Sequence, residues 1–443
     1  MNRSNPSDVV IIGGGFAGCA AAMRLVREGI HPILIEFKLK LGGRATSYKI
    51  AGWPDTLDNG QHVLLGCCTE TRKFLESVGA SDALEWFSDL PISDGNGHID
   101  VLRPWPVGAP LHLAPFLFRF PGLGMIQRAA LAQGIVRLAF SANHDDLDWA
   151  QTARKFGQTE QIRRAFWDPF LVSALNYEPD RAAARHVRHI VQDAFWRGRG
   201  GMEIGVPRVP LLALFTDYVQ HALERSSVVL KLGKRTLRLS LSPRGGFVVH
   251  LHDQSALNAR KIVLATGPAI ARMILEESTG VEETAEKITP VLGGSAIISI
   301  HLLYDRVMTN LPFCMVQNKM IQWIFNKGVH DGRQHLQAII SAADAASQQS
   351  QTELVVAGDV EVRQALGTDG QLVTGNAIIE KEATFPPRAG LVRPGVNASN
   401  HPDLFLAGDY VDGDWPGTIE SAVRSGVAAA EAVIRSCGSP VSS

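Results

Sequence analysis

Cysteine is scarce in this sequence, and no two cysteines have the spacing of a redox pair or a metal site. The chain has 443 residues and five cysteines, at positions 19, 67, 68, 314 and 437. Adjacent Cys67 and Cys68 are best interpreted as two small buried residues. The odd count and the absence of a disulfide framework favour a reducing compartment, and we expect no metal site.

A charge bias and a membrane-length apolar run are also missing. The formal net charge is −1, which excludes the basic balance typical of a nucleic-acid-binding protein. The uncharged or weakly charged stretch 9–23 contains several glycines and is shorter than a membrane span, so it is neither a signal peptide nor a transmembrane helix. Length and composition indicate a globular protein of two or three domains.

Alternating strand and helix patterns predict a dinucleotide-binding fold of class α/β. Residues 8–12 and 32–36 are apolar strands, and the Ala-rich segment 16–28 between them is helical, which completes a βαβ unit. Residues 260–268 and 404–410 are two further strands, and 419–436 is a helix. Three alternating segments, VVLKL, TLRLSL and GFVVHLH, predict a small antiparallel meander between residues 228 and 252.

The dinucleotide-binding fold is therefore split along the sequence. We expect a discontinuous cofactor domain with Rossmann-like topology from residues 1–85, 225–285 and 390–443. The intervening stretches 86–224 and 286–389 would form a second, mixed α+β domain for the substrate and for membrane contact.

A glycine fingerprint lies in the first βαβ unit. Gly13, Gly15 and Gly18 form GxGxxG between strand and helix, where the glycines allow a tight turn, backbone approach to a pyrophosphate and close helix packing. Glu36 ends the second strand and is placed to accept the ribose hydroxyls, which argues against NADP. The fingerprint alone does not separate NAD from FAD.

Three further segments favour FAD. LGGRATS (41–47) resembles the GGR segment of the amine oxidase and carotenoid desaturase superfamily, AGDYVDGDWPGTIESAVRSG (407–426) resembles its C-terminal flavin motif, and VLATGP (263–268) matches its returning strand. The resemblance implies an amine oxidase-like fold with bound FAD. The residues expected to bind FAD are Gly13, Gly15, Phe16, Ala17, Gly18, Glu36, Gly43, Arg44, Gln61, His62, Thr236, Ala265, Gly267, Gly408, Asp409, Thr418 and Ile419.

The resemblance narrows at LDNGQHVLLGC (57–67), which is similar to the squalene-associated hydroxysqualene dehydroxylases. The resemblance to that family extends to RPWPVGAPLHL (103–113), to the stretch from RGRGG (197–201) to VPRVPLLALF (206–215), to IQWIFNK (321–327) and to EKEATFPP (380–387). The likeness covers essentially the whole chain. It implies FAD-dependent removal of the hydroxyl of hydroxysqualene to give squalene, in bacterial squalene and hopanoid synthesis. Two alternatives stay open: a carotenoid desaturase or isomerase, and a non-catalytic prenyl-binding protein of the same architecture.

The implied reaction needs a proton donor near the flavin, because hydroxide leaves readily only as water. His62 is the leading catalytic candidate, and Asp58 is a second candidate that also suits a turn-organising role. Asp412, Asp414 and Glu420 are expected mostly to cap or solvate the C-terminal helix. Aromatic residues that could line a substrate tunnel are Trp105, Trp167, Trp196, Trp323 and Trp415, although core packing is the better interpretation for most of them.

A basic apolar segment predicts contact with an anionic membrane. Residues 101–143 contain no Asp or Glu but four arginines, Arg103, Arg119, Arg128 and Arg137, among several aromatic residues. We therefore expect a cytoplasmic protein that associates peripherally with the inner face of the cytoplasmic membrane and takes a lipophilic isoprenoid substrate. No second glycine turn follows a strand, so we expect an external electron donor or flavin reductase.

Overall fold

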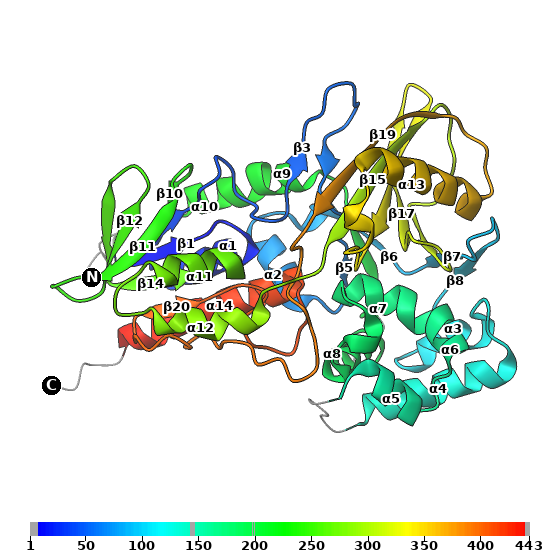
Figure 1. Cartoon of the computed structure of the whole chain (residues 1–443), viewed down its shortest axis with the longest axis horizontal. Helices are drawn as coiled ribbons and strands as arrows, with labels where there is room; N and C mark the ends of the chain where they lie inside the picture. Colours follow the sequence, from blue (N-terminus) through cyan, green and yellow to red (C-terminus); the bar gives the residue numbers. More distant parts are fainter. Residues whose placement is uncertain (1–7, 142–146, 197, 199, 439–443) are drawn as a thin grey trace.

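The computed structural model describes residues 8–141, 147–196, 198 and 200–438. Figure 1 shows a parallel sheet with its helices at one end of an elongated molecule. A larger antiparallel sheet and a group of helices occupy the other end. The predicted α/β fold class, with a parallel sheet and a second mixed α+β region, is confirmed.

The parallel sheet has the strand order β10-β2-β1-β14-β20. Its central strands are fully buried, which explains their continuous apolar sequences. Helices α1 and α14 pack closely on the sheet and on each other, where Gly426 lets the backbones approach. The elements are β1 (Val9–Ile12), α1 (Phe16–Val26), β2 (Ile33–Ile35), β10 (Val229–Lys231), β14 (Lys261–Leu264), α11 (Pro268–Glu276), α12 (Glu283–Ile288), β20 (Leu404–Leu406) and α14 (Ile419–Gly438).

One predicted strand belongs to a different sheet. VVLKL was expected to open the antiparallel meander, but β10 pairs in parallel with β2 and forms the edge of the main sheet. The antiparallel sheet consists of β11 (Thr236–Leu241), β12 (Phe247–Leu251) and β13 (Ala256–Ala259). The expectation was wrong because three residues of alternating apolar character fit an edge strand of either sheet.

A seven-stranded sheet forms the second region, in the order β19-β15-β18-β17-β16-β7-β8. Its strands pair in antiparallel fashion, except that β16 and β7 run parallel. Helix α13 (Gln351–Leu366) covers one face and begins with a capping box formed by Ser350 and Glu353. The strands are β7 (Leu90–Ser93), β8 (Ile99–Leu102), β15 (Ile297–Tyr304), β16 (Phe313–Val316), β17 (Trp323–His330), β18 (Arg333–Ile340) and β19 (Leu372–Glu380).

A helical layer lies beside this sheet and shares an aromatic core with it (Figure 1). Trp149 and Trp167 are fully buried there, and the Trp167 indole donates to Gln158 Oε1. The helices are α3 (Ala114–Arg119), α4 (Met125–Ala139), α5 (Trp149–Lys155), α6 (Glu160–Ile162), α7 (Asp168–Leu175) and α8 (Ala184–Ile190), with π-helical turns at Arg163–Trp167 and Val191–Trp196.

Short elements join the two regions. They are β3 (Ser47–Tyr48), β4 (Leu57–Asp58), β5 (Leu64–Leu65), α2 (Thr69–Ser77), β6 (Leu84–Phe87), β9 (Ile204–Pro207), α9 (Leu211–Ala213) and α10 (His221–Arg225). Residues 211–223 pack in the same apolar cluster as α1, including an edge contact of Phe215 with Phe16. The domain boundary expected at residue 224 stays a prediction.

Candidate functional site

A deep cleft opens at the carboxyl ends of β1, β14 and β20. It has an empty volume of about 1840 Å³. Its wall comes from six segments far apart in the sequence, together with His62. The segments lie within residues 13–17, 36–48, 265–270, 291–294, 380–385 and 408–422. Of the residues expected to bind the cofactor, fourteen line this cleft: Gly13, Gly15, Phe16, Ala17, Glu36, Gly43, Arg44, His62, Ala265, Gly267, Gly408, Asp409, Thr418 and Ile419.

Two fingerprint glycines have different physical reasons to be glycine. A Cβ added at Gly18 would lie 1.9 Å from the carbonyl oxygen of Gly13, so α1 could not approach β1 with any side chain there. A Cβ at Gly15 would meet only Gly43 Cα, at 3.8 Å. The protein therefore leaves space at Gly15 on the cleft side, where a bound group can contact the backbone.

Charged residues hold the rim of the cleft in place. The Glu36 carboxylate is buried and accepts hydrogen bonds from the amides of Gly14 (2.7 Å) and Lys38 (2.9 Å). Arg44 donates to Asp409 Oδ1 (2.5 Å) and to the carbonyl of Ala383 (2.7 Å). The GGR segment and the C-terminal motif, 365 positions apart, are thus joined by an ion pair at the cleft.

The C-terminal motif provides a capped helix that starts at the cleft. The Thr418 hydroxyl accepts from the Ser421 amide (3.2 Å), and the Ser421 hydroxyl donates to the carbonyl of Asp409 (3.0 Å). Glu420 interacts with its own helix and with a second one. It is fully buried and accepts from Arg424 Nε one turn along α14 (2.7 Å). It also accepts from the amides of Glu70 and Thr71, at the N-terminus of α2, because those amides have no partner within their helix.

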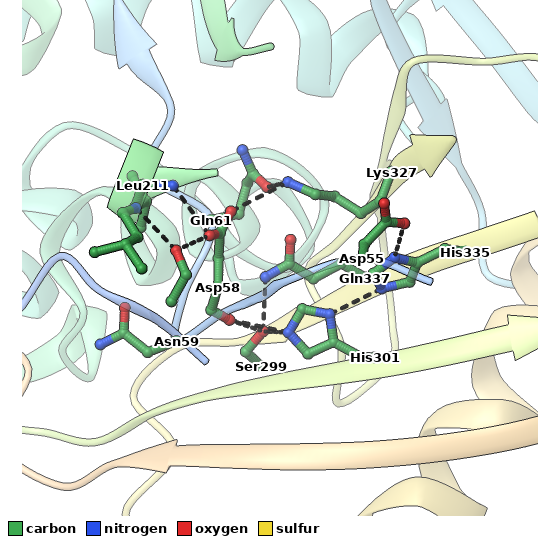
Figure 2. Close-up of polar contacts among 12 residues, drawn as sticks. Asp55, Asp58, Asn59, Gln61, Leu211, Ser299, His301, Lys327, His335 and Gln337 are labelled. Atoms are coloured by element: carbon green, nitrogen blue, oxygen red, sulfur yellow. Dashed lines mark hydrogen bonds and ion pairs between the residues drawn. The ribbon is translucent and has the colours of Figure 1, made fainter. Parts of the chain in front are cut away.

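The turn after β4, residues 58–63, forms part of the cleft wall. The buried Asp58 carboxyl receives three donors: Ser47 Oγ (2.6 Å), the Leu211 amide (3.1 Å) and Lys327 Nζ (3.3 Å). Lys327 comes from β17 and also donates to Gln61 Oε1 (3.1 Å), as Figure 2 shows. A carboxyl surrounded by donors is an acceptor, which favours the turn-organising role for Asp58.

His62 lies in the cleft wall itself. Its Nε2 atom is buried and has no hydrogen-bond partner within the described parts of the chain. Burial lowers the pKa of His62 to about 4, with Asp58 raising it and Arg44 lowering it. The imidazole is therefore neutral at neutral pH.

A second, apolar cavity lies on the other side of the same turn. It has an empty volume of about 700 Å³, and Val63, the residue after His62, belongs to its wall. Ser88, His112 and Glu203 are polar exceptions in this wall. The apolar residues that line it are Val63, Leu65, Leu90, Pro104, Leu113, Phe116, Phe170, Ala194, Met202, Ile204, Met315 and Trp323.

The remaining predicted residues lie outside the wall of the cleft. Gly18 acts through packing, Gln61 turns toward Lys327, and Thr236 is buried on β11. Of the five tryptophans, Trp323 lines the apolar cavity, whereas Trp105 is half exposed. Arg197 and Arg199 of the RGRGG stretch lie outside the described residues. Among the described residues, no group of three or more His, Cys, Asp or Glu is placed to hold a metal ion.

Sequence reasoning missed Lys327 and the polar residues of the cavity. Lys327 stands in IQWIFNK, which carried only a general likeness. Its contact with Asp58 spans 269 positions, so no local pattern could have revealed it.

Comparison with known proteins identifies the fold and its relatives. The family described as flavin containing amine oxidoreductase matches residues 16–434. A hydroxysqualene dehydroxylase of Sinorhizobium fredii is 26% identical, covering 96% of this chain and 98% of the relative, and one of Rhodopseudomonas palustris has the same values. A 15-cis-phytoene desaturase of Capsicum annuum is 22% identical, covering 98% of this chain and 78% of the relative.

Solved structures agree on the architecture. A redesigned putrescine oxidase superposes with a TM-score of 0.72 at 15% identity, covering 97% of this chain and 99% of that one. The predicted amine oxidase-like fold and the predicted resemblance to hydroxysqualene dehydroxylases are both confirmed.

Proposed function

Because the chain belongs to the flavin-containing amine oxidoreductase family, we propose that the cleft binds FAD and that the enzyme reduces an isoprenoid alcohol held in the apolar cavity. Hydroxysqualene is the proposed substrate and squalene the product. The 26% sequence identity to two hydroxysqualene dehydroxylases, over nearly the whole chain, supports this choice of substrate.

The residues of the cleft fit FAD. The open space at Gly15 would take the pyrophosphate, next to the N-terminus of α1, whose partial positive charge favours an anion. Glu36, which lines the cleft, would accept the ribose hydroxyls. Asp409, held by Arg44, and the N-terminus of α14 at Thr418 and Ile419 would bind the remaining part of the cofactor.

The turn at residues 58–63 is the observation on which the substrate proposal rests. His62 lines the cleft and Val63 lines the apolar cavity, so one turn separates a flavin-sized cleft from a chamber suited to hydrocarbon. Pockets lined mainly by apolar side chains, with few polar groups, are typical sites for lipophilic ligands.

The protein must supply a proton and exclude water. Reduced FAD supplies a hydride when bound. His62 is the leading proton donor in this proposal, because its unpartnered Nε2 lies in the cleft wall beside the cavity. Asp58 would hold the turn through its contacts with Ser47 and Leu211. Protonation of the substrate hydroxyl would release it as water and leave an allylic cation on the isoprenoid chain. The apolar cavity wall would keep other water from this cation until the hydride is transferred.

The segment that forms part of this cavity also presents an apolar outer face. Leu113 and Phe116 line the cavity, whereas Leu111 and Phe118 of the same segment are exposed. The exposed residues of this docking face are Trp105, Val107, Leu111, Phe118, Met125, Ile126, Val136 and Phe140, with Met125 and Ile126 about 85% and 84% exposed. We propose that this face rests on the inner surface of an anionic cytoplasmic membrane, from which the substrate reaches the cavity.

The four arginines of residues 101–143 differ in their exposure and contacts. Arg119 and Arg137 are exposed and would contact lipid phosphates. Arg103 pairs with Asp89, and Arg128 donates to the carbonyls of Phe118 and Phe120 at the end of α3. Among the residues that the structure describes, none of the helices combines the length and apolar character needed to cross a bilayer.

Electrons would come from outside the chain. We expect little reduction of the bound flavin by NAD(P)H alone, and activity once a separate flavin reductase is added. Flavin bleaching by NAD(P)H with the purified protein, in the absence of any reductase, would contradict this expectation.

The test of the proposed function is product analysis. Photoreduced protein is incubated anaerobically with hydroxysqualene, and in parallel oxidised protein is incubated with phytoene. Squalene from the first incubation alone supports the proposal. Desaturated carotenes from the second alone would assign the protein to the desaturases, which the match to phytoene desaturases keeps as the second candidate.

A further inference from the structure

A chain of polar groups extends from the backbone of Asp58 through two buried histidines to the partly exposed Asp55 (Figure 2). His301 Nε2 lies 2.9 Å from the carbonyl oxygen of Asp58, and His301 Nδ1 lies 3.0 Å from His335 Nε2. His335 Nδ1 then lies 3.1 Å from Asp55 Oδ2. His301 is on β15, His335 is on β18, and Asp55 precedes β4.

Both ends of this chain are acceptors. A carbonyl oxygen stands at one end and a carboxylate at the other, so each of the three contacts needs a proton between its two atoms. Two neutral imidazoles carry two N–H protons in total. The neutral pair can therefore make only two of the three hydrogen bonds, and the third requires an additional proton.

The neighbours of His301 determine which of the three hydrogen bonds the neutral pair cannot make. Ser299 Oγ lies 3.1 Å from His301 Nε2 and accepts from Gln337 Nε2 (2.7 Å). Its own hydrogen can point either at the carbonyl oxygen of Asp58, 3.4 Å away, or at His301. Without the extra proton, His301 can accept from Ser299 while His335 still donates to Asp55. The Ser299 hydrogen is then used at His301, so the carbonyl of Asp58 loses both of these donors.

We propose that protonation of the His301 and His335 pair controls the position of the turn at residues 58–63. When the pair shares one extra proton, His301 donates to the carbonyl of Asp58. When that proton is lost, this hydrogen bond is lost as well. His301 is a positioning residue, because it acts on the cleft through the turn that carries His62. The inference concerns this turn and holds for any substrate of the site.

Several charged groups face the pair. The charge of Lys327 on β17 lowers the pKa of both His301 and His335, and His330 on β17 lowers the pKa of His335. Asp55 favours it, and His330 Nε2 also lies 2.8 Å from Asp55 Oδ2. Burial lowers the pKa of His301 to about 3 and lowers that of His335, while Asp55 raises the pKa of His335. The shared proton therefore sits at the His335 end, and it is lost as the pH rises.

Asp55→Asn is the sharpest variant, because it changes one end of the chain from acceptor to donor. The new amide can donate to His335 Nδ1, so two neutral rings then satisfy all three contacts. Proton uptake by the pair should disappear, while the hydrogen bond to Asp58 persists at every pH.

The experiment is a pH titration of histidine ring resonances in the labelled, flavin-loaded protein, with assignments from His301→Asn and His335→Asn. In the parent protein the His301 and His335 resonances should shift together with one midpoint and one proton, and the His62 resonance should follow. In Asp55→Asn this shared transition should be absent. Ser299→Ala should move the midpoint up by roughly 0.5–1 pH unit, because the neutral pair loses its alternative donor.

Asp100→Asn is the matched control, because Asp100 is an exposed carboxylate 3.4 Å from His98. It should change the His98 resonance and leave the shared transition as it is. Two neutral rings throughout the pH range in which the parent stays folded would overturn the inference. So would a titration in Asp55→Asn equal to that of the parent.

Discussion

Backbone atoms form much of the wall of the proposed flavin cleft, whereas side-chain carbon forms most of the wall of the apolar cavity. Among the described residues, ten glycines line the cleft, including Gly13, Gly15 and Gly408, and none lines the cavity. A wall of backbone and fixed charges should recognise one rigid cofactor, and a side chain added at Gly15 would occupy the space proposed for that cofactor. A wall of apolar side chains selects by volume, and a change in its volume should alter selectivity while the cofactor stays bound.

The strongest test of this difference adds a side chain to the backbone wall. Gly15→Val would fill the space where the pyrophosphate is proposed to lie, so the purified variant should contain almost no flavin. Flavin content per protein, measured by absorbance after denaturation, checks this. Gly395→Val is the control, because Gly395 also has open space around its Cβ but lies outside the cleft. Normal flavin content in Gly15→Val would contradict the proposal that the cofactor lies against the backbone at Gly15.

The next test acts at the boundary between the two regions. If His62 is the acid, His62→Ala should slow the reaction by roughly 10²–10⁴-fold. Because burial lowers its pKa to about 4, the charged form is scarce at neutral pH and becomes more abundant as the pH falls. The rate of the parent should rise about tenfold per unit from pH 8 to pH 6, and this slope should vanish in His62→Ala. An equal slope in both proteins would remove His62 from the role.

A third test changes the volume of the cavity only. Ser88→Phe places a ring at an exposed position of the cavity wall, where no buried side chain must move. We expect normal flavin content and a loss of about tenfold or more in kcat/KM for the isoprenoid alcohol. Ser81→Phe, at an exposed position outside the cavity, is the matched control. A loss of flavin in Ser88→Phe would mean that the two regions are not separable.

The smallest effect is expected at the docking face. Replacing both Arg119 and Arg137 with Glu should weaken binding to anionic vesicles by about fivefold or more per residue, with activity in detergent unchanged. Arg238→Glu with Arg244→Glu makes the same charge change on the β11–β12 hairpin, at the opposite end of the molecule in Figure 1. Equal vesicle co-sedimentation of both double variants would contradict a specific docking face.

Much of the cofactor region could be predicted because its constraints are local. The first strand, helix and second strand were expected at 8–12, 16–28 and 32–36, and each observed element lies within these limits. A tight turn and a close helix contact require glycine at fixed positions, so the spacing of Gly13 and Gly18 predicts both features from the sequence. The strand at 229–231 was assigned to the wrong sheet, because pairing partners depend on distant residues.

The substrate region could not be predicted in the same way. Its cavity is lined by residues from β7, α3, α7 and β17 that meet only after folding, and any of them would pass as ordinary core. Lys327 and the pair His301 and His335 have no sequence signal, since each contact joins positions far apart. The local interpretation of Glu420 was incomplete, because besides Arg424 of its own helix it accepts from amides that begin a different helix.

The central claim is that the turn at residues 58–63 separates a flavin from an isoprenoid chain. The most direct measurement is a crystal structure of the FAD-loaded protein with squalene bound. The account predicts the isoalloxazine in the cleft beside His62 and the hydrocarbon in the cavity against Val63 and Trp323. Squalene bound elsewhere, with the cavity empty and His62 away from the flavin, would contradict it.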